Sequence, residues 1–88
     1  MKIKQGFVLE KVGSSYLAVA VGDMAKSFQG LVRMNETGAF MWNIIKERDA
    51  SSEELVEALS AEYDAPRELL VRDVSSFEEK LRNAGIIE

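Results

Sequence analysis

The hydrophobic pattern of this chain changes near residue 34, and that change limits the folds available to it. Before residue 34, short apolar and β-branched segments are separated by glycine and serine, as in strands and turns. After it, apolar residues recur three and four positions apart, as they do along amphipathic helices. Strands followed by helices predict an α+β fold. We expect residues 1–88 to form one such domain, with strands within about 7–34 and helices within about 36–85.

Three segments of the first part are strand candidates. Residues 7–12 are rich in β-branched and aromatic side chains. Residues 16–21 form a continuous apolar run, which predicts a strand that is central in its sheet or buried on both faces. Residues 28–34 form a shorter third strand, in which Gly30 is a candidate bulge. The polar residues 22–27 between them are predicted to form a loop.

Three helices are predicted from capping residues as well as from spacing. Asn35 suits the N-cap of the first, and Ser51 with Glu54 has the spacing of a capping box for the second. The third helix begins at residues 64–66, because proline is tolerated in a first turn. It should end before Gly85, a residue suited to the position after a helix.

The composition argues against catalysis. The chain has no cysteine and no histidine, so it lacks a disulfide, a thiolate metal site and the commonest general base. Its glycines are too scattered for a phosphate-binding loop. The adjacent carboxylates at 53–54 and 78–79 point about 100° apart on a helix and cannot converge on one ion. We therefore expect a noncatalytic protein that uses no metal and no cofactor.

The charge is unevenly distributed along the chain. The net charge is −4, which argues against binding to nucleic acid or to anionic membranes. Residues 1–34 carry five basic and two acidic side chains, whereas residues 35–88 carry six basic and thirteen acidic ones. No apolar run is long enough to span a membrane, and the first residues lack a signal-peptide core. A cytoplasmic location is the expectation.

A DNA-binding regulator is the main rival hypothesis, because a sheet beside two short helices and a longer one makes a winged-helix-like arrangement. The third helix offers basic side chains to phosphates but intersperses them with acidic ones, whereas a groove-reading helix carries a cationic excess. The basic residues are Arg67, Arg72, Lys80 and Arg82, and the acidic residues are Glu68, Asp73, Glu78 and Glu79.

The third strand is the most informative element. Hairpin connections give the strand order 1-2-3, so this strand lies at an edge with unpaired backbone groups. Its residues Leu31, Val32 and Met34 are apolar, and Arg33 is its one charged residue. The edge could be covered by the chain's own loop or by a second copy, which leaves a structural dimerisation domain as a third hypothesis. It could instead bind a peptide that adds a strand.

Two aromatic residues are candidate binding anchors. Trp42 and Phe77 belong to the residue types that dominate binding hot spots. Core packing is the alternative for both, and the heptad-like spacing around Phe77 favours it there.

Residues 34–42, Met-Asn-Glu-Thr-Gly-Ala-Phe-Met-Trp, resemble the signature Leu-Asn-Glu-Thr-(Ala/Gly)-Ala-x-Ile-Trp of the PqqD-like family. The family is named for protein D of pyrroloquinoline quinone synthesis. The resemblance extends from about Phe7 to Ile87 and includes residues 52–56, 62–64, 73–77 and 84–87. Methionine at positions 34 and 41, where the family has leucine or another aliphatic residue, is a mild departure.

The resemblance implies a recognition domain with a winged-helix-like fold, in which a three-stranded antiparallel sheet is followed by three helices. Such domains bind the leader of a ribosomally made precursor peptide and present the precursor to a modifying enzyme, often a radical SAM enzyme. The leader adds as a strand to strand 3 and packs on helix 3. The implied contacts are the backbone of Leu31, Val32, Arg33 and Met34, and the helix residues Asp73, Ser76, Phe77 and Lys80.

Three further expectations accompany the resemblance. The Asn-Glu-Thr-Gly-Ala box sets the corner between strand and helix and does not touch the ligand. The leader is acidic or amphipathic, because Arg33 lies on a docking edge in the positive part of the chain. The protein is a monomer or a homodimer.

Overall fold

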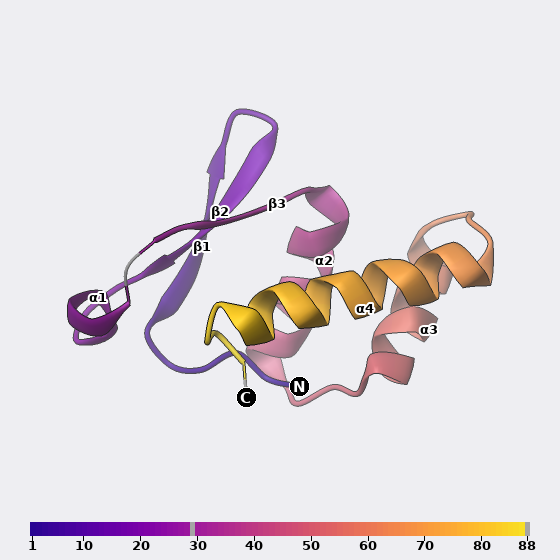
Figure 1. The fold of residues 1–88 in the computed structure, drawn as a ribbon. Coiled ribbons are helices and arrows are strands. Elements are labelled where there is room, and N and C mark those ends of the chain that lie inside the picture. Colours follow the sequence, from indigo (N-terminus) through magenta and orange to yellow (C-terminus); the bar gives the residue numbers. More distant parts are fainter. Residues whose placement is uncertain (29, 88) are drawn as a thin grey trace.

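The computed structural model describes residues 1–28 and 30–87 and confirms an α+β fold in which an antiparallel sheet is followed by helices (Figure 1). The elements in chain order are β1 (Phe7–Val12), β2 (Ser15–Ala20), α1 (Met24–Ser27), β3 (Val32–Met34), α2 (Glu36–Glu47), α3 (Ser52–Glu62) and α4 (Arg67–Asn83). None of these helices is long and apolar enough to cross a membrane.

The sheet has the order β1-β2-β3, with both neighbouring pairs antiparallel. Gly13 turns the chain between β1 and β2 with a φ of +63°, a conformation that suits glycine. β2 is the central strand, as predicted, but only Ala18 in it is fully buried. β3 is an edge strand, and in register Tyr16 lies opposite Met34. The sequence-based strand order is therefore confirmed.

The region between β2 and β3 differs from the prediction. The predicted loop contains the single helical turn α1, which is too short to show a helical periodicity in the sequence. The predicted strand 28–34 is wrong in its first half, because only Val32–Met34 is extended in the sheet. Gly30 has a φ of +121° and interrupts the extended backbone instead of forming a bulge within it. Phe28 packs edge-on against Phe7, and Gln29 lies outside the described residues.

The predicted caps of α2 and α3 and the glycine after α4 are confirmed, whereas α4 begins at Arg67, with Pro66 as its N-cap, just after the predicted start at 64–66. The Asn35 side chain accepts a hydrogen bond from the Gly38 backbone N–H at 2.8 Å. Ser51 and Glu54 form both halves of a capping box at the start of α3. Gly85 follows α4 with a φ of +79°. These contacts satisfy N–H groups at helix starts that have no partner within the helix.

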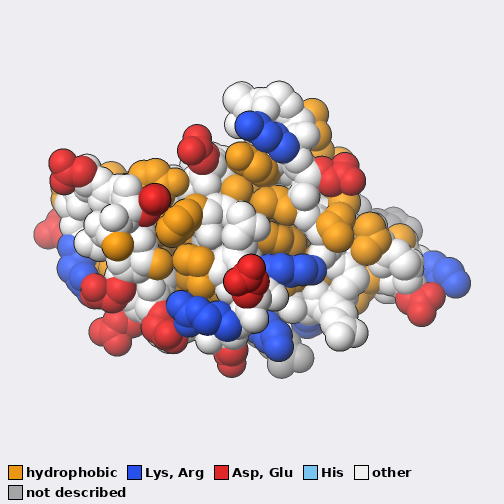
Figure 2. Space-filling view, turned by 180° about the vertical axis from the view of Figure 1, so that it is seen from behind, with side chains coloured by type: hydrophobic (Ala, Val, Ile, Leu, Met, Phe, Trp, Pro, Cys, Tyr) orange, Lys and Arg blue, Asp and Glu red, His pale blue; other side chains and the backbone are white. Residues whose placement is uncertain are grey.

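The core lies between one face of the sheet and helices α2, α3 and α4. Trp42 is only 1% exposed, so it is a core residue and not an exposed anchor. Phe77 is 6% exposed and belongs to the same cluster. Acidic side chains gather on the left of Figure 2, over the end of the molecule that carries α3, as the charge distribution in the sequence predicts.

Glu78 links α4 to the start of α3 and makes the stability sensitive to acid. The Ser52 hydroxyl donates to Glu78 Oε1 at 2.6 Å, and the Arg82 guanidinium lies 2.8 Å from Oε2. These contacts hold the pKa of Glu78 below its ordinary value of 4.5. The unfolded chain therefore takes up a proton first, and the stabilisation present above about pH 4.5 is lost as the pH falls through the lower folded-state value.

The Glu78→Gln variant should therefore lose less stability than the wild type between pH 6 and pH 3. Urea unfolding curves measured across this range provide the test. Glu79→Gln, at the exposed neighbouring position, is the matched control and should follow the wild type. Parallel pH curves for the wild type and Glu78→Gln would contradict the assignment.

Candidate functional site

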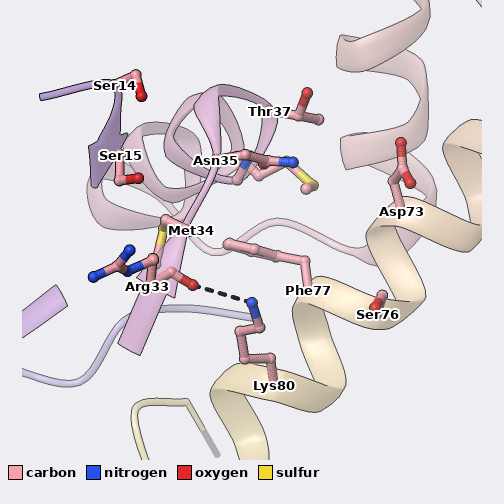
Figure 3. A pocket seen from close by; sticks show the side chains of 12 residues that line it. Ser14, Ser15, Arg33, Met34, Asn35, Thr37, Asp73, Ser76, Phe77 and Lys80 are labelled. Atoms are coloured by element: carbon pink, nitrogen blue, oxygen red, sulfur yellow. Dashed lines mark hydrogen bonds between the residues drawn. The ribbon is translucent and has the colours of Figure 1, made fainter. Parts of the chain in front are cut away.

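A groove runs between β3 and α4, beside the first turn of α2 (Figure 3). Its cavity volume is about 460 Å³. It is lined by residues from the β1–β2 turn and four elements: Ser14, Ser15, Arg33, Met34, Asn35, Thr37, Gly38, Met41, Asp73, Ser76, Phe77 and Lys80. The sheet edge, α2 and α4 therefore build one concave surface from segments far apart in the chain.

The floor of the groove is apolar. Met34, Met41 and Phe77 are all nearly buried, with exposed fractions of 5%, 2% and 6%. They come from β3, α2 and α4, and the Phe77 ring points from α4 toward β3 (Figure 3). Phe77 thus serves the core and the groove at once. The two methionines are flexible and polarisable, so this floor can adapt to an apolar side chain placed on it.

The rim of the groove is polar and carries both signs of charge. Asp73, Ser76 and Lys80 lie along one side of α4 (Figure 3). The Lys80 ammonium reaches across the groove and donates to the Arg33 backbone carbonyl at 3.0 Å. Lysine near a free strand is one of the devices that protect sheet edges from unwanted pairing.

The Lys80 hydrogen bond also reveals which way the backbone of β3 points. In an antiparallel ladder, the N–H and C=O of one residue point to the same side, and successive residues alternate. Because the Arg33 carbonyl points toward α4, its N–H points to the free edge as well. Val32 and Met34 then direct their backbone groups toward β2, with which they are paired.

The other side of β2 gives the same result independently. The Val21 N–H donates to the Gly6 carbonyl at 2.8 Å, on the side of β1. Alternation then turns the backbone groups of Ala18 and Tyr16 toward β3. Of the predicted residues 31–34, Arg33 therefore directs its backbone groups to the free edge of β3, whereas Val32 and Met34 direct theirs to β2.

Most of the predicted site residues come together here. Arg33, Met34, Asp73, Ser76, Phe77 and Lys80 all line the groove. Leu31 precedes β3 and is 64% exposed, and the Val32 side chain packs against the core, so neither lines the groove.

The sequence prediction missed the contribution of α2 and of the β1–β2 turn. Thr37 and Met41 are four residues apart on one face of α2 and both line the groove. Asn35 and Gly38 also line it, so the box that sets the corner borders the site as well. The i,i+4 spacing of Thr37 and Met41 could have identified them in the sequence as residues on one face of this helix. Nothing in the sequence placed Ser14 and Ser15 there, since that depends on the register between β2 and β3.

Gly38 permits the close approach of α2 to β3. A Cβ atom at this position would lie 2.9 Å from the Met34 Cβ, closer than two such atoms can approach without a shift of the backbone. Gly38→Ala should therefore destabilise the protein by about 1 kcal/mol, because the overpacking outweighs the gain in helix propensity. A thermal unfolding midpoint lower by roughly 4–8 °C is expected for a domain of this size. A raised midpoint would show that the corner can relax.

A three-stranded antiparallel sheet followed by helices, with a groove along its free strand, places the chain among small α+β domains. The chain belongs to the PqqD family: the family model described as coenzyme PQQ synthesis protein D (PqqD) matches residues 17–87. This confirms the family resemblance seen in the sequence, with a match that begins ten residues later than the expected start near Phe7.

A solved structure of TbiB1 in complex with the TbiA(beta) leader peptide has the same fold. The TM-score is 0.75 at 24% sequence identity, and the superposition covers 100% of this chain and 95% of that chain. No curated protein matches the sequence closely enough to count as a relative.

Proposed function

We propose that this protein binds the leader region of a ribosomally made precursor peptide and presents the precursor to a modifying enzyme, without catalysing a reaction itself. The observation that carries the proposal is the groove between the free edge of β3 and α4, with its apolar floor and charged rim. Membership of the PqqD family and the shared fold with a protein solved in complex with a leader peptide support it.

In this proposal the leader lies along β3 as a fourth strand. Its backbone pairs with the N–H and C=O of Arg33, the outward-facing residue of the strand. Side chains of an extended peptide alternate in direction, so every second one faces α4. An apolar leader side chain placed there would cover Met34, Met41 and Phe77 and exclude water from them.

The leader must displace Lys80 from the strand edge. Its ammonium donates a hydrogen bond to the Arg33 carbonyl, with which the incoming strand would have to pair. Once released, the ammonium stays at the rim of the groove, where a carboxylate of the leader can replace the lost partner. An acidic leader therefore satisfies Lys80 after binding, whereas a neutral leader leaves it solvated.

The modifying enzyme then acts on the part of the precursor that extends beyond the groove. Binding in this mode holds only a short segment of peptide, so the rest stays free to enter an active site elsewhere. A radical SAM enzyme is the proposed partner, as is common for domains of this family.

Fluorescence anisotropy with a labelled leader, taken from the precursor encoded beside this gene, tests the proposal. A strand of about six residues should bind with a Kd of ~1 μM, or about −8 kcal/mol. A scrambled leader of the same composition is the control. Absence of binding at ~100 μM to any neighbouring precursor would overturn the proposal.

The affinity should fall moderately with salt. The charges near the groove are few and exposed, so screening should weaken the complex about threefold between 50 and 300 mM salt. The same anisotropy titration repeated at four salt concentrations measures the slope. A Kd that does not change with salt would mean that Arg33 and Lys80 contribute nothing through their charge.

A further inference from the structure

The second face of the sheet lies outside the hydrophobic core of the described residues, and its Val8, Leu17 and Val19 are half-buried. Side chains alternate along a strand, so Val8, Leu17 and Val19 point away from the face that carries the buried Ala18. None of these three belongs to the hydrophobic core or packs against it. Val12, on the same face, is 55% exposed. Helices α2, α3 and α4 lie together on the other side of the sheet (Figure 1).

An apolar outer face is unusual in a sheet of this kind. An antiparallel sheet with one covered face alternates apolar and polar residues, with the polar ones in water. The continuous apolar run of β2 instead predicts a strand covered on both sides. Among the described residues the hydrophobic core lies on one side of the sheet, and the apolar residues on the other side, Val8, Val12, Leu17 and Val19, indicate an interaction surface.

The two charged residues on this face indicate what covers it. Glu10, Leu17 and Arg33 are cross-strand neighbours and form a row across β1, β2 and β3. The row is acidic at one end, apolar in the middle and basic at the other end. If two copies stack face to face about a two-fold axis parallel to β2, Glu10 of each copy lies over Arg33 of the other. Leu17 and Val19 of the central strand then meet their own counterparts.

We propose that the outer face of the sheet is an interface between two copies of this chain. The face is self-complementary in charge and apolar along the axis, as an isologous contact requires. Three strands of six residues or fewer span roughly 300 Å² per copy, well below the ~800 Å² per partner of a stable complex. The small area indicates a weak association, and we expect a Kd of ~100 μM.

Sedimentation equilibrium between about 10 μM and 1 mM tests this interface. The weight-average mass should rise from near the monomer mass of 9.8 kDa to almost twice that value. Leu17→Lys should remain monomeric over the whole range. Val71→Lys, which replaces an exposed apolar residue on α4 instead, is the matched control and should behave like the wild type.

A charge exchange gives a second, sharper test. Glu10→Arg and Arg33→Glu should each weaken the self-association about tenfold, because each leaves like charges facing across the interface. The double variant restores opposite charges and should recover most of the loss. Wild-type protein that stays monomeric at 1 mM overturns the proposal, even if a modifying enzyme proves to bind this face. A double variant that self-associates no more tightly than either single variant overturns the proposal as well.

The apolar part of this interface does not overlap the groove, because Val8, Leu17 and Val19 do not line it, whereas Arg33 belongs to both surfaces. Leu17→Lys should bind the leader within about twofold of the wild-type affinity. Failure to bind any leader would therefore contradict the proposed function and leave the sedimentation result unaffected.

Discussion

Replacing Ser76 by tryptophan should weaken leader binding strongly while leaving the fold intact. Ser76 is exposed on α4 and lines the groove beside Phe77, so an indole at this position would occupy the space above the apolar floor. We expect the affinity to fall by at least about tenfold, since the leader strand could no longer approach α4. Anisotropy titration with the labelled leader measures the change. The stability should stay within about 0.5 kcal/mol, as for most surface substitutions.

Ser75 provides the matched control for this experiment. It is the preceding residue of the same helix and is also exposed, but it lines a different hollow with Val56 and Val71. Ser75→Trp should bind the leader as the wild type does. Equal losses of affinity in both variants would mean that the peptide binds elsewhere on the helix. No loss of affinity in either variant would mean that α4 does not contact the peptide.

The second large effect is expected at the backbone of Arg33. Arg33→Pro removes the one N–H of β3 that points to the free edge, and proline is tolerated at an edge strand. A carbonyl of the leader then loses its donor and is buried without a partner, which costs about 1–3 kcal/mol. Leader binding should weaken about tenfold to a hundredfold, as measured by anisotropy or calorimetry.

Arg33→Ala separates the backbone contribution from that of the side chain. It keeps the N–H and removes only the guanidinium, so the affinity should fall less than about threefold at moderate salt. Val32 is unsuitable for such a test, because its N–H points to β2 and proline there would break the sheet. If Arg33→Pro folds and binds as tightly as Arg33→Ala, the leader does not pair with this edge.

The two experiments examine different parts of one mechanism. The tryptophan at position 76 tests whether the groove beside α4 is filled by the peptide, and the proline at position 33 tests whether the strand edge is paired. If the leader binds through strand addition, both Ser76→Trp and Arg33→Pro must lower its affinity. Sensitivity to Ser76→Trp alone would indicate a peptide held by its side chains in the groove, without pairing to β3.

Much of the architecture could be predicted because it depends on local signals. Asn35, the Ser51–Glu54 pair and Gly85 are capping residues whose geometry involves only near neighbours. The edge position of β3 followed from hairpin connections alone. The prediction was wrong for residues 24–27, which form a helical turn, and for residues 28, 30 and 31, which lie outside the strand, because one turn and the positive φ of Gly30 leave no periodic pattern to detect.

The sequence also predicted half of the groove. Arg33, Met34, Asp73, Ser76, Phe77 and Lys80 were named together because the resemblance to the PqqD-like family implied contacts on strand 3 and helix 3, and all six line the groove. The wall formed by Thr37 and Met41 depends on how α2 is oriented against the sheet. That orientation is set by the close approach of Gly38 to Met34, which involves the packing of two elements.

The sequence by itself determined the order of elements, the helix caps, the free strand and the family, because each of these depends on residue type and on short spacings. Only the tertiary structure decided which backbone groups of β3 remain free, since that depends on the register with β2 and on the reach of Lys80. It also decided that, within the described part of the chain, one face of β2 packs on the hydrophobic core and the other does not. A continuous apolar run is typical of a strand that is buried on both faces. Whether residues of the same chain bury the second face depends on where the helices pack.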